Sequence, residues 1–279
     1  LKPFWLKSCS AFANGFEVAI LRLLPRMQAM PYRRRPWTTA MTLVAVAATR
    51  AHAFRAGGSA GVAPSWVEER LTYSDGVPYW DWFYQTEPGT YDWLQKFEGV
   101  RGLVEEVTGG NHAASLLHPG CGSSRLAEEM YDAGYRNITN IDSCAMVIER
   151  MAARSRNRSD MAWAVMDATN MSLPSGSFRV VVDKGLMDNL ACMDDSPVVL
   201  HAYLREVSRV LRLGGAFLCI SFGEPSTRLR VFDWAFDEGL HEGVRFRVRA
   251  VRLPKSYEGG GAHWAYIART PRTTASPQR

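Results

Sequence analysis

The 279-residue sequence lacks the cysteine patterns of a metal centre or a disulfide framework. No CxxC pair and no zinc-ligand spacing occurs among its five cysteines, Cys9, Cys121, Cys144, Cys192 and Cys219. Four of them fall in apolar or turn segments of the presumed domain, which is typical of small buried thiols. We therefore expect neither structural zinc nor disulfides, and no metal in the functional site.

Acidic residues are nearly absent from the first 53 positions, which hold eight basic residues and only Glu17 as an acid. The remaining 25 basic and 27 acidic residues give the rest of the chain a net charge of −2, against +5 for the whole sequence. The basicity therefore belongs to the N-terminal segment. A nucleic-acid partner is not expected, because a phosphate-binding surface needs its positive charge on the folded domain.

No hydrophobic run is long enough to span a bilayer comfortably; the apolar stretch at 37–49 is too short. Basic PYRRRP precedes this stretch and RAHA follows it, an arrangement typical of a cleavable leader. We expect residues 1–64 to be a targeting segment, disordered or cleaved, with no stable membrane insertion of the mature domain. A plastid destination is favoured and a mitochondrial one is the alternative; the protein would be cytoplasmic if the leader does not function.

The third glycine of a dinucleotide fingerprint is also missing from LLHPGCGSS at 116–124, since Arg125 stands where G-x-G-x-x-G needs it. The two glycines present allow positive φ and close approach to the backbone, and the helix expected next offers free N–H groups to a polar ligand. A tight strand-to-helix turn with no ligand is the simpler alternative.

Alternating strand and helix patterns fill the rest of the chain. Strands are expected at 114–118, 137–142, 161–167, 178–183, 216–222, 244–253 and 263–268, and helices near 91–107 and at 125–134, 144–155, 197–211 and 227–239. This order predicts an α/β fold: a Rossmann-like, seven-stranded, mostly parallel sheet with helices on both faces and an antiparallel last strand. The domain should cover 65–270, with a disordered tail at 271–279.

Two acids follow strands of this sheet. Asp142 ends the second strand about twenty residues after the glycine bend, where a carboxylate suits two ribose hydroxyls. Both dinucleotides and S-adenosylmethionine (SAM) carry such a ribose. Asp167 ends the third strand and can accept a hydrogen bond from an adenine amine, which favours SAM. Alternatively, Asp142 caps the next helix and binds nothing.

The stretches HPGCGSSRLAEEMYDAGYRNITNID and WAVMDATNMSLPSGSFRVVVDKGLMDNL resemble class I SAM-dependent methyltransferases. Within that class, the sequence is most similar to the lineage of elongation factor 1A lysine methyltransferases and methyltransferase-like protein 13. The similarity covers about 66–268 and includes the aromatic stretches YWDWFY and YDWL. It implies a methyltransferase with SAM as cofactor, a methyl-acceptor partner, expected to be a protein, and a lysine as the expected acceptor.

The resemblance also implies roles for individual residues. The glycine bend would pass beneath the methionine part of the cofactor, Asp142 and Ser143 would lie at the ribose, and Asp167 and Ala168 at the adenine. Four further side chains would close the site from above, and aromatic faces suit a sulfonium, although ordinary packing also explains them. The expected cofactor-binding set is Trp80, Tyr84, Trp93, Gly120, Cys121, Gly122, Asp142, Ser143, Asp167, Ala168 and Lys184.

Catalytic groups are expected near the DKGLMDNL stretch, where Asp183 and Asp188 are candidates to orient an acceptor amine. This stretch differs from the lineage's usual DKGTLDAL at three positions, and His118 stands where many methyltransferases place an acid. Substrate identity is therefore not carried over. The alternatives are a small-molecule methyltransferase, a non-catalytic SAM-binding module and an NAD(P)-dependent oxidoreductase. The oligomeric state is not predicted.

Overall fold

A computed structural model describes residues 71–237, 246–254 and 262–270, all of which belong to one compact unit. The expected leader at 1–64, the glycine-rich loop at 255–261 and the tail at 271–279 lie outside these residues. Within the described part of the chain, no helix is both long and apolar enough to cross a membrane.

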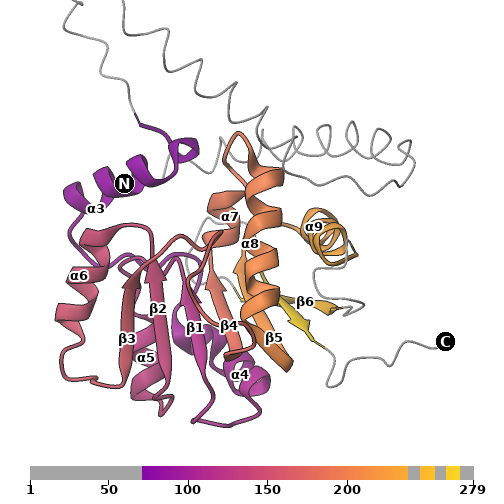
Figure 1. The fold of residues 1–279 in the computed structure, drawn as a ribbon, viewed down its shortest axis with the longest axis horizontal. Helices are drawn as coiled ribbons and strands as arrows, with labels where there is room; N and C mark the ends of the chain where they lie inside the picture. Colours follow the sequence, from indigo (N-terminus) through magenta and orange to yellow (C-terminus); the bar gives the residue numbers. More distant parts are fainter. Residues whose placement is uncertain (1–70, 238–245, 255–261, 271–279) are drawn as a thin grey trace, which may run out of the picture. The chain divides into compact units, whose positions relative to one another are not determined.

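Seven strands form one sheet in the order β3-β2-β1-β4-β5-β7-β6 (Figure 1). Strands β1 to β5 pair in parallel, whereas β7 runs antiparallel to both β5 and β6. The predicted fold class is confirmed. The strands are β1 (Leu116–Pro119), β2 (Ile138–Asp142), β3 (Met161–Val165), β4 (Phe178–Lys184), β5 (Leu211–Ser221), β6 (Arg247–Leu253) and β7 (His263–Arg269).

Helices cover the sheet on two faces: in Figure 1, α7 and α8 lie in front of it and α4 and α5 behind it. Apolar residues at helical spacing explain the packing, since Val100, Val104 and Val107 of α4 are fully buried. The helices are α3 (Val77–Thr86), α4 (Phe97–Thr108), α5 (Leu126–Asp132), α6 (Ala145–Arg154), α7 (Leu186–Leu190), α8 (Ser196–Val210) and α9 (Pro225–Asp237), preceded by the 3-10 turn η1 (Tyr73–Asp75).

Several elements differ from the sequence prediction, and α3 is not among the expected helices. Helix α4 begins at Phe97 rather than near 91, because the chain turns sharply at Leu94, whose φ is 65°. The five-residue α7 was not predicted. Strand β5 begins at Leu211, ahead of the expected 216, and its pairing with β4 shifts register between Phe178 and Val180.

The carboxyl ends of β1, β2, β3 and β4 meet at one edge of the sheet, since Pro119 is paired with Ile141 and Asp142 with Val165. Helix α3 is held near this edge by a small apolar cluster in which Tyr84 packs with residues of α6 and its N-cap. Arg150 of α6 also donates to the backbone oxygen of Tyr84 at 2.9 Å. The fold thus brings an aromatic helix to the edge at which parallel sheets bind ligands.

Candidate active site

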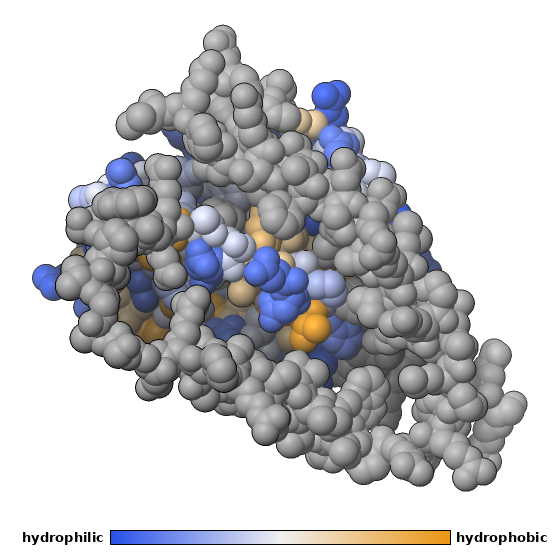
Figure 2. Space-filling model, turned by 90° about the horizontal axis from the view of Figure 1, so that it is seen from above, coloured by the Kyte–Doolittle hydropathy of each residue, from blue (hydrophilic) through white to orange (hydrophobic). Residues whose placement is uncertain are grey.

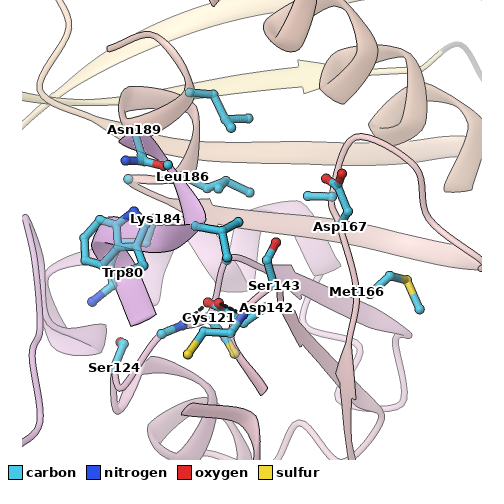
Figure 3. A pocket seen from close by; sticks show the side chains of 18 of the residues that line it. Trp80, Cys121, Ser124, Asp142, Ser143, Met166, Asp167, Lys184, Leu186 and Asn189 are labelled. Carbon is cyan, nitrogen blue, oxygen red and sulfur yellow. Dashed lines mark hydrogen bonds between the residues drawn. The ribbon is translucent and has the colours of Figure 1, made fainter. Parts of the chain in front are cut away.

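A cavity of ≈ 560 Å³ lies at this edge of the sheet, bounded by α3, α7 and the loops after β1 to β4. All eleven residues of the expected cofactor-binding set line it. In Figure 3, Asp142 and Ser143 lie below Leu186 and Asn189, with Trp80 to one side and Asp167 to the other. The face seen in Figure 2 shows hydrophilic and hydrophobic side chains next to each other among the described residues.

The glycine bend has the expected backbone conformation, with φ of 58° at Gly120 and 50° at Gly122. Side chains of the protein itself also require these glycines. A Cβ at Gly120 would lie 2.9 Å from Leu186, and one at Gly122 would lie 2.5 Å from the hydroxyl of Tyr84. Part of the space over the bend is therefore used by Leu186 and Tyr84, and the cavity lies beside them.

Asp142 contacts the backbone of both the glycine bend and the next helix, and it also lines the cavity. Its Oδ2 accepts from the Gly122 N–H at 2.9 Å and its Oδ1 from the Cys144 N–H at 3.0 Å, at the start of α6. Burial raises the pKa of Asp142, and these two N–H groups offset part of that rise. The carboxylate therefore fixes the bend and the helix start, and it keeps lone pairs that these two N–H groups do not use.

Asp167 follows β3 on the side of the cavity away from Trp80 (Figure 3). Its Oδ1 accepts from the backbone N–H and the hydroxyl of Thr169, both at 2.8 Å. This local turn fixes the carboxylate, and the adjacent Ala168 is buried. The two aspartates thus mark two separate parts of one cavity.

Lys184, at the end of β4, is paired with Asp92 at 2.7 Å and donates to the backbone oxygen of Gln95 at 3.1 Å. Burial lowers the pKa of Lys184, and the Asp92 carboxylate offsets part of this effect. Asp92 also accepts from the hydroxyl of Ser124, next to the glycine bend. Burial raises the pKa of Asp92, but the charge and hydrogen bond of Lys184, together with the hydrogen bonds from Ser124 and the Arg125 N–H, outweigh burial and leave this pKa lowered. The pair joins the segment before α4, the bend and β4.

His118 is buried, lines the cavity, and has an Nδ1 atom without a hydrogen-bond partner. Burial lowers its pKa to about 4, and the charge of Lys184 adds to this effect. The ring is therefore neutral at physiological pH and leaves one nitrogen for a ligand in the cavity. This neutral side chain occupies the place where the resembled family has an acid.

The aromatic residues both pack and line the cavity. Trp80 stacks on Tyr84, with ring centroids 5.6 Å apart and planes at 28°. Trp93 covers Gly185, where an added Cβ would lie 2.6 Å from the indole ring. Because packing fixes these rings, their faces toward the cavity are rigid surfaces for an aromatic or cationic ligand.

The structure does not bring the expected catalytic aspartates to the cavity. Asp183 is fully buried and accepts from the N–H groups of Leu186 and Met187 at 2.9 and 3.0 Å and from the hydroxyl of Tyr203 at 2.7 Å. Burial raises its pKa to about 7 although three donors face it. It holds the start of α7, so it cannot reach an acceptor amine.

Asp188 is equally buried, on the side of α7 away from the cavity. It accepts from the hydroxyl of Ser221, from the Phe222 N–H at 3.0 Å and from Arg228, with which it forms an ion pair at 2.7 Å. Its oxygens are satisfied by the protein. Neither Asp183 nor Asp188, the two residues expected to orient the acceptor, lines the cavity, and the contacts described above give both a structural role.

The sequence did not point to several residues of the site, among them Leu186 and Asn189, which line the cavity, and Asp92, which pairs with Lys184. Asp92 lies within the YDWL stretch, but its partner Lys184 is too distant in the sequence for the pair to be visible. Leu186 and Asn189 line the cavity from α7. They are two of the three positions at which DKGLMDNL departs from the lineage pattern, and this departure is the signal that points to them.

Within the described part of the chain, no group of three or more histidine, cysteine or carboxylate side chains could hold a metal ion, and the four cysteines are free thiols. Cys121, Cys144 and Cys219 are buried free thiols, and Cys192 is partly exposed. Burial strongly raises the pKa of the Cys121 thiol, with a further contribution from Asp142. The cavity therefore presents carboxylates, a neutral imidazole, a paired lysine and aromatic rings.

Parts of this sequence are similar to known proteins. The model of a methyltransferase domain family matches residues 117–219. The chain is 35% identical over 179 residues to an eEF1A lysine and N-terminal methyltransferase of Bos taurus, which covers 63% of this chain and 25% of the relative. It therefore spans about a quarter of the length of that relative. A solved SAM-dependent methyltransferase from Methanosarcina mazei has 17% identity and a TM-score of 0.48, covering 61% of this chain and 97% of that one.

A second relative is covered more completely. The chain is 31% identical over 183 residues to EEF1A lysine methyltransferase 4 of Bos taurus, with 62% of this chain and 71% of the relative covered. The domain match and this similarity agree with the sheet order and with the glycine bend and two strand-end aspartates in one cavity. The chain belongs to the family of SAM-dependent methyltransferases that includes EEF1A lysine methyltransferase 4, and its cofactor is SAM.

Proposed function

We propose that this protein transfers a methyl group from SAM to the side chain of a lysine in another protein. The observation that carries the proposal is the extent of the cavity, which continues past the expected cofactor residues to Val77, Leu190, Met193 and Val199. An apolar passage of this kind suits an aliphatic side chain that reaches the cofactor from outside. The names of the relatives, which describe them as lysine methyltransferases, support the same acceptor.

The residues present fit SAM. Asp142 is placed to accept hydrogen bonds from two ribose hydroxyls and Asp167 from the adenine amine, and His118 has a buried nitrogen without a partner. When bound, SAM supplies a methyl group on a positively charged sulfur, which is already activated for displacement. Trp80 and Trp93 provide aromatic faces that attract such a cation.

The protein's own contribution is mainly orientation. Alignment of donor and acceptor in a rigid site can lower a barrier by about 7–11 kcal/mol. Leu186 and the aromatic residues exclude water from the bend, and the ion pair of Lys184 with Asp92 fixes the loop beside it. A lysine amine has a pKa of about 10.4 in water, so the site must favour its neutral form.

Tritiated SAM tests this proposal. The purified protein is incubated with labelled SAM and a whole-cell extract, the products are separated by size, and labelled protein is hydrolysed to amino acids. We expect the label in methylated lysine. Label only in small molecules would show a small-molecule methyltransferase, and SAM binding without any transfer would show a non-catalytic module. Isothermal titration with SAM and with nicotinamide dinucleotides excludes or establishes the oxidoreductase alternative.

A further inference from the structure

The apolar end of the cavity contains one polar side chain that nothing in the fold explains. This end, here called the acceptor end, is formed by Gly76, Val77, Asn189, Leu190, Met193 and Val199. Its two sides touch, since a Cβ at Gly76 would lie 3.2 Å from the terminal methyl of Met193. Asn189 is only 7% exposed, and its amide nitrogen Nδ2 is buried without a hydrogen-bond partner. A buried amide without a partner costs free energy unless a ligand completes it.

Helix α7 directs Asn189 into the cavity. Leu186, Asn189 and Leu190 lie three and four residues apart, hence on one face of the helix, and all three line the cavity. Leu186 sits directly over the glycine bend. On the opposite face, Asp188 is fixed by its buried ion pair with Arg228. The helix therefore cannot rotate, and Asn189 stays one turn beyond the bend, as its position in Figure 3 shows.

The acceptor end carries no charge. The only carboxylates among the described lining residues are Asp142 and Asp167, which follow β2 and β3, and the only ammonium is that of Lys184, which is paired with Asp92. Asp81 of α3 interacts with Cys144 and Asp142, which are not part of the acceptor end. An ammonium entering between α3 and α7 would therefore lose its water and meet no carboxylate among the residues that form the acceptor end. A neutral amine on an unbranched aliphatic stem fits both the apolar walls and a single amide.

We propose that Asn189 orients the methyl acceptor, and that the acceptor end selects a primary amine in its neutral form. This inference rests on the proposed function and specifies its substrate class. Nδ2 is a donor, but a flip of the amide places the acceptor Oδ1 at the position where Nδ2 has no partner, and there Oδ1 accepts an N–H of the amine. The lone pair of the amine then points toward the bend. This lone pair forms the new bond from nitrogen to the methyl carbon, while the bond from sulfur to that carbon breaks and its electron pair moves to sulfur. The surplus proton of the methylated amine then leaves to water.

Direct binding of an amine tests the acceptor end without turnover. The probe is n-butylamine, which has the four-carbon stem of lysine. It is titrated into protein saturated with S-adenosylhomocysteine, and binding is followed by tryptophan fluorescence because Trp80 and Trp93 line the cavity. The neutral fraction of the amine rises about tenfold per pH unit below its pKa. Apparent affinity should rise about tenfold per unit between pH 8 and pH 9.5. An affinity that is independent of pH, or no binding at either pH, overturns the inference.

Two substitutions test Asn189 itself. Asn189→Ala should leave SAM affinity within about twofold but weaken amine binding and protein labelling by about tenfold, the loss of one hydrogen bond. Asn189→Asp adds a carboxylate that favours the ammonium, so the pH at which labelling reaches half its maximum should rise by about one unit. Asn137→Ala, an exposed asparagine before β2 at the other end of the sheet, is the matched control.

The outcomes separate this inference from the proposed function. Wild-type labelling by Asn189→Ala, or an unchanged pH profile in Asn189→Asp, refutes the role of Asn189. Parallel loss of SAM and amine binding also refutes it, because Asn189 would then contact the cofactor. Amine binding that depends on Asn189 without any labelled protein in the extract would instead refute the lysine acceptor and leave the amine site standing.

Discussion

Replacement of Asp142 by asparagine separates its two roles. Alanine would remove the acceptors of both the Gly122 and the Cys144 N–H, at 2.9 and 3.0 Å, and would disturb the bend together with the ligand site. Asparagine keeps one oxygen for these groups and removes the charge that faces the cavity. We expect a loss of about 1–3 kcal/mol in the free energy of unfolding, or a fall in Tm of about 2–4 °C per kcal/mol.

The effect on SAM binding should be larger. A hydrogen bond to a charged group contributes about 1.5–3 kcal/mol, which corresponds to an increase in Kd of roughly 10- to 150-fold. Isothermal titration of SAM into wild-type protein and Asp142→Asn measures it, with Asp160→Asn, an exposed carboxylate before β3, as control. A Kd for SAM unchanged by Asp142→Asn in a protein with a cooperative thermal transition would refute the ribose assignment.

Three further experiments test the surrounding structure. Gly122→Ala should lower the free energy of unfolding, measured by urea denaturation, by about 2 kcal/mol or more. Adding Tyr84→Phe should restore part of this loss, because the nearest ring atom would then be 3.5 Å from the alanine Cβ. A double variant with no restored stability would contradict the contact. Arg228→Met should lower the free energy of unfolding by about 3–5 kcal/mol, because it leaves the Asp188 carboxylate buried without its ion-pair partner. Adding Asp188→Asn removes that charge and should recover stability. A double variant no more stable than Arg228→Met alone would argue against the ion pair. In the folded protein the pKa of His118 is lowered from 6.5 to about 4, so the unfolded chain takes up this proton first as the pH falls. The free energy of unfolding should therefore fall by up to about 3 kcal/mol between pH 6.5 and pH 4. This part of the pH dependence should disappear in His118→Gln, and its persistence would show that another group is responsible.

The fold, and the gathering of the expected residues in one cavity, could be predicted because their signals are local. Each parallel strand is a short apolar run, and the residue after it must lie at the carboxyl edge, so Asp142 and Asp167 could be placed in one pocket before the structure was known. The glycines of the bend were equally visible, since positive φ is an intrinsic preference.

The acceptor side could not be predicted because it depends on tertiary contacts. Helix α7 has only five residues and starts where Asp183 accepts two of its N–H groups, which no periodicity reveals. The same carboxylates that seemed catalytic in the sequence are used to hold this helix. Likewise, Lys184 and Asp92 meet across the cavity only after the segment before α4 folds back over β4.

A crystal structure of the protein with S-adenosylhomocysteine would show directly whether the cavity at the carboxyl edge of the sheet binds the cofactor. We expect the ribose hydroxyls within hydrogen-bond distance of Asp142 and the adenine amine at Asp167. The sulfur should lie close to the glycine bend, with the acceptor end still open. A ligand bound outside this cavity, or with its adenine at the acceptor end, would contradict this expectation.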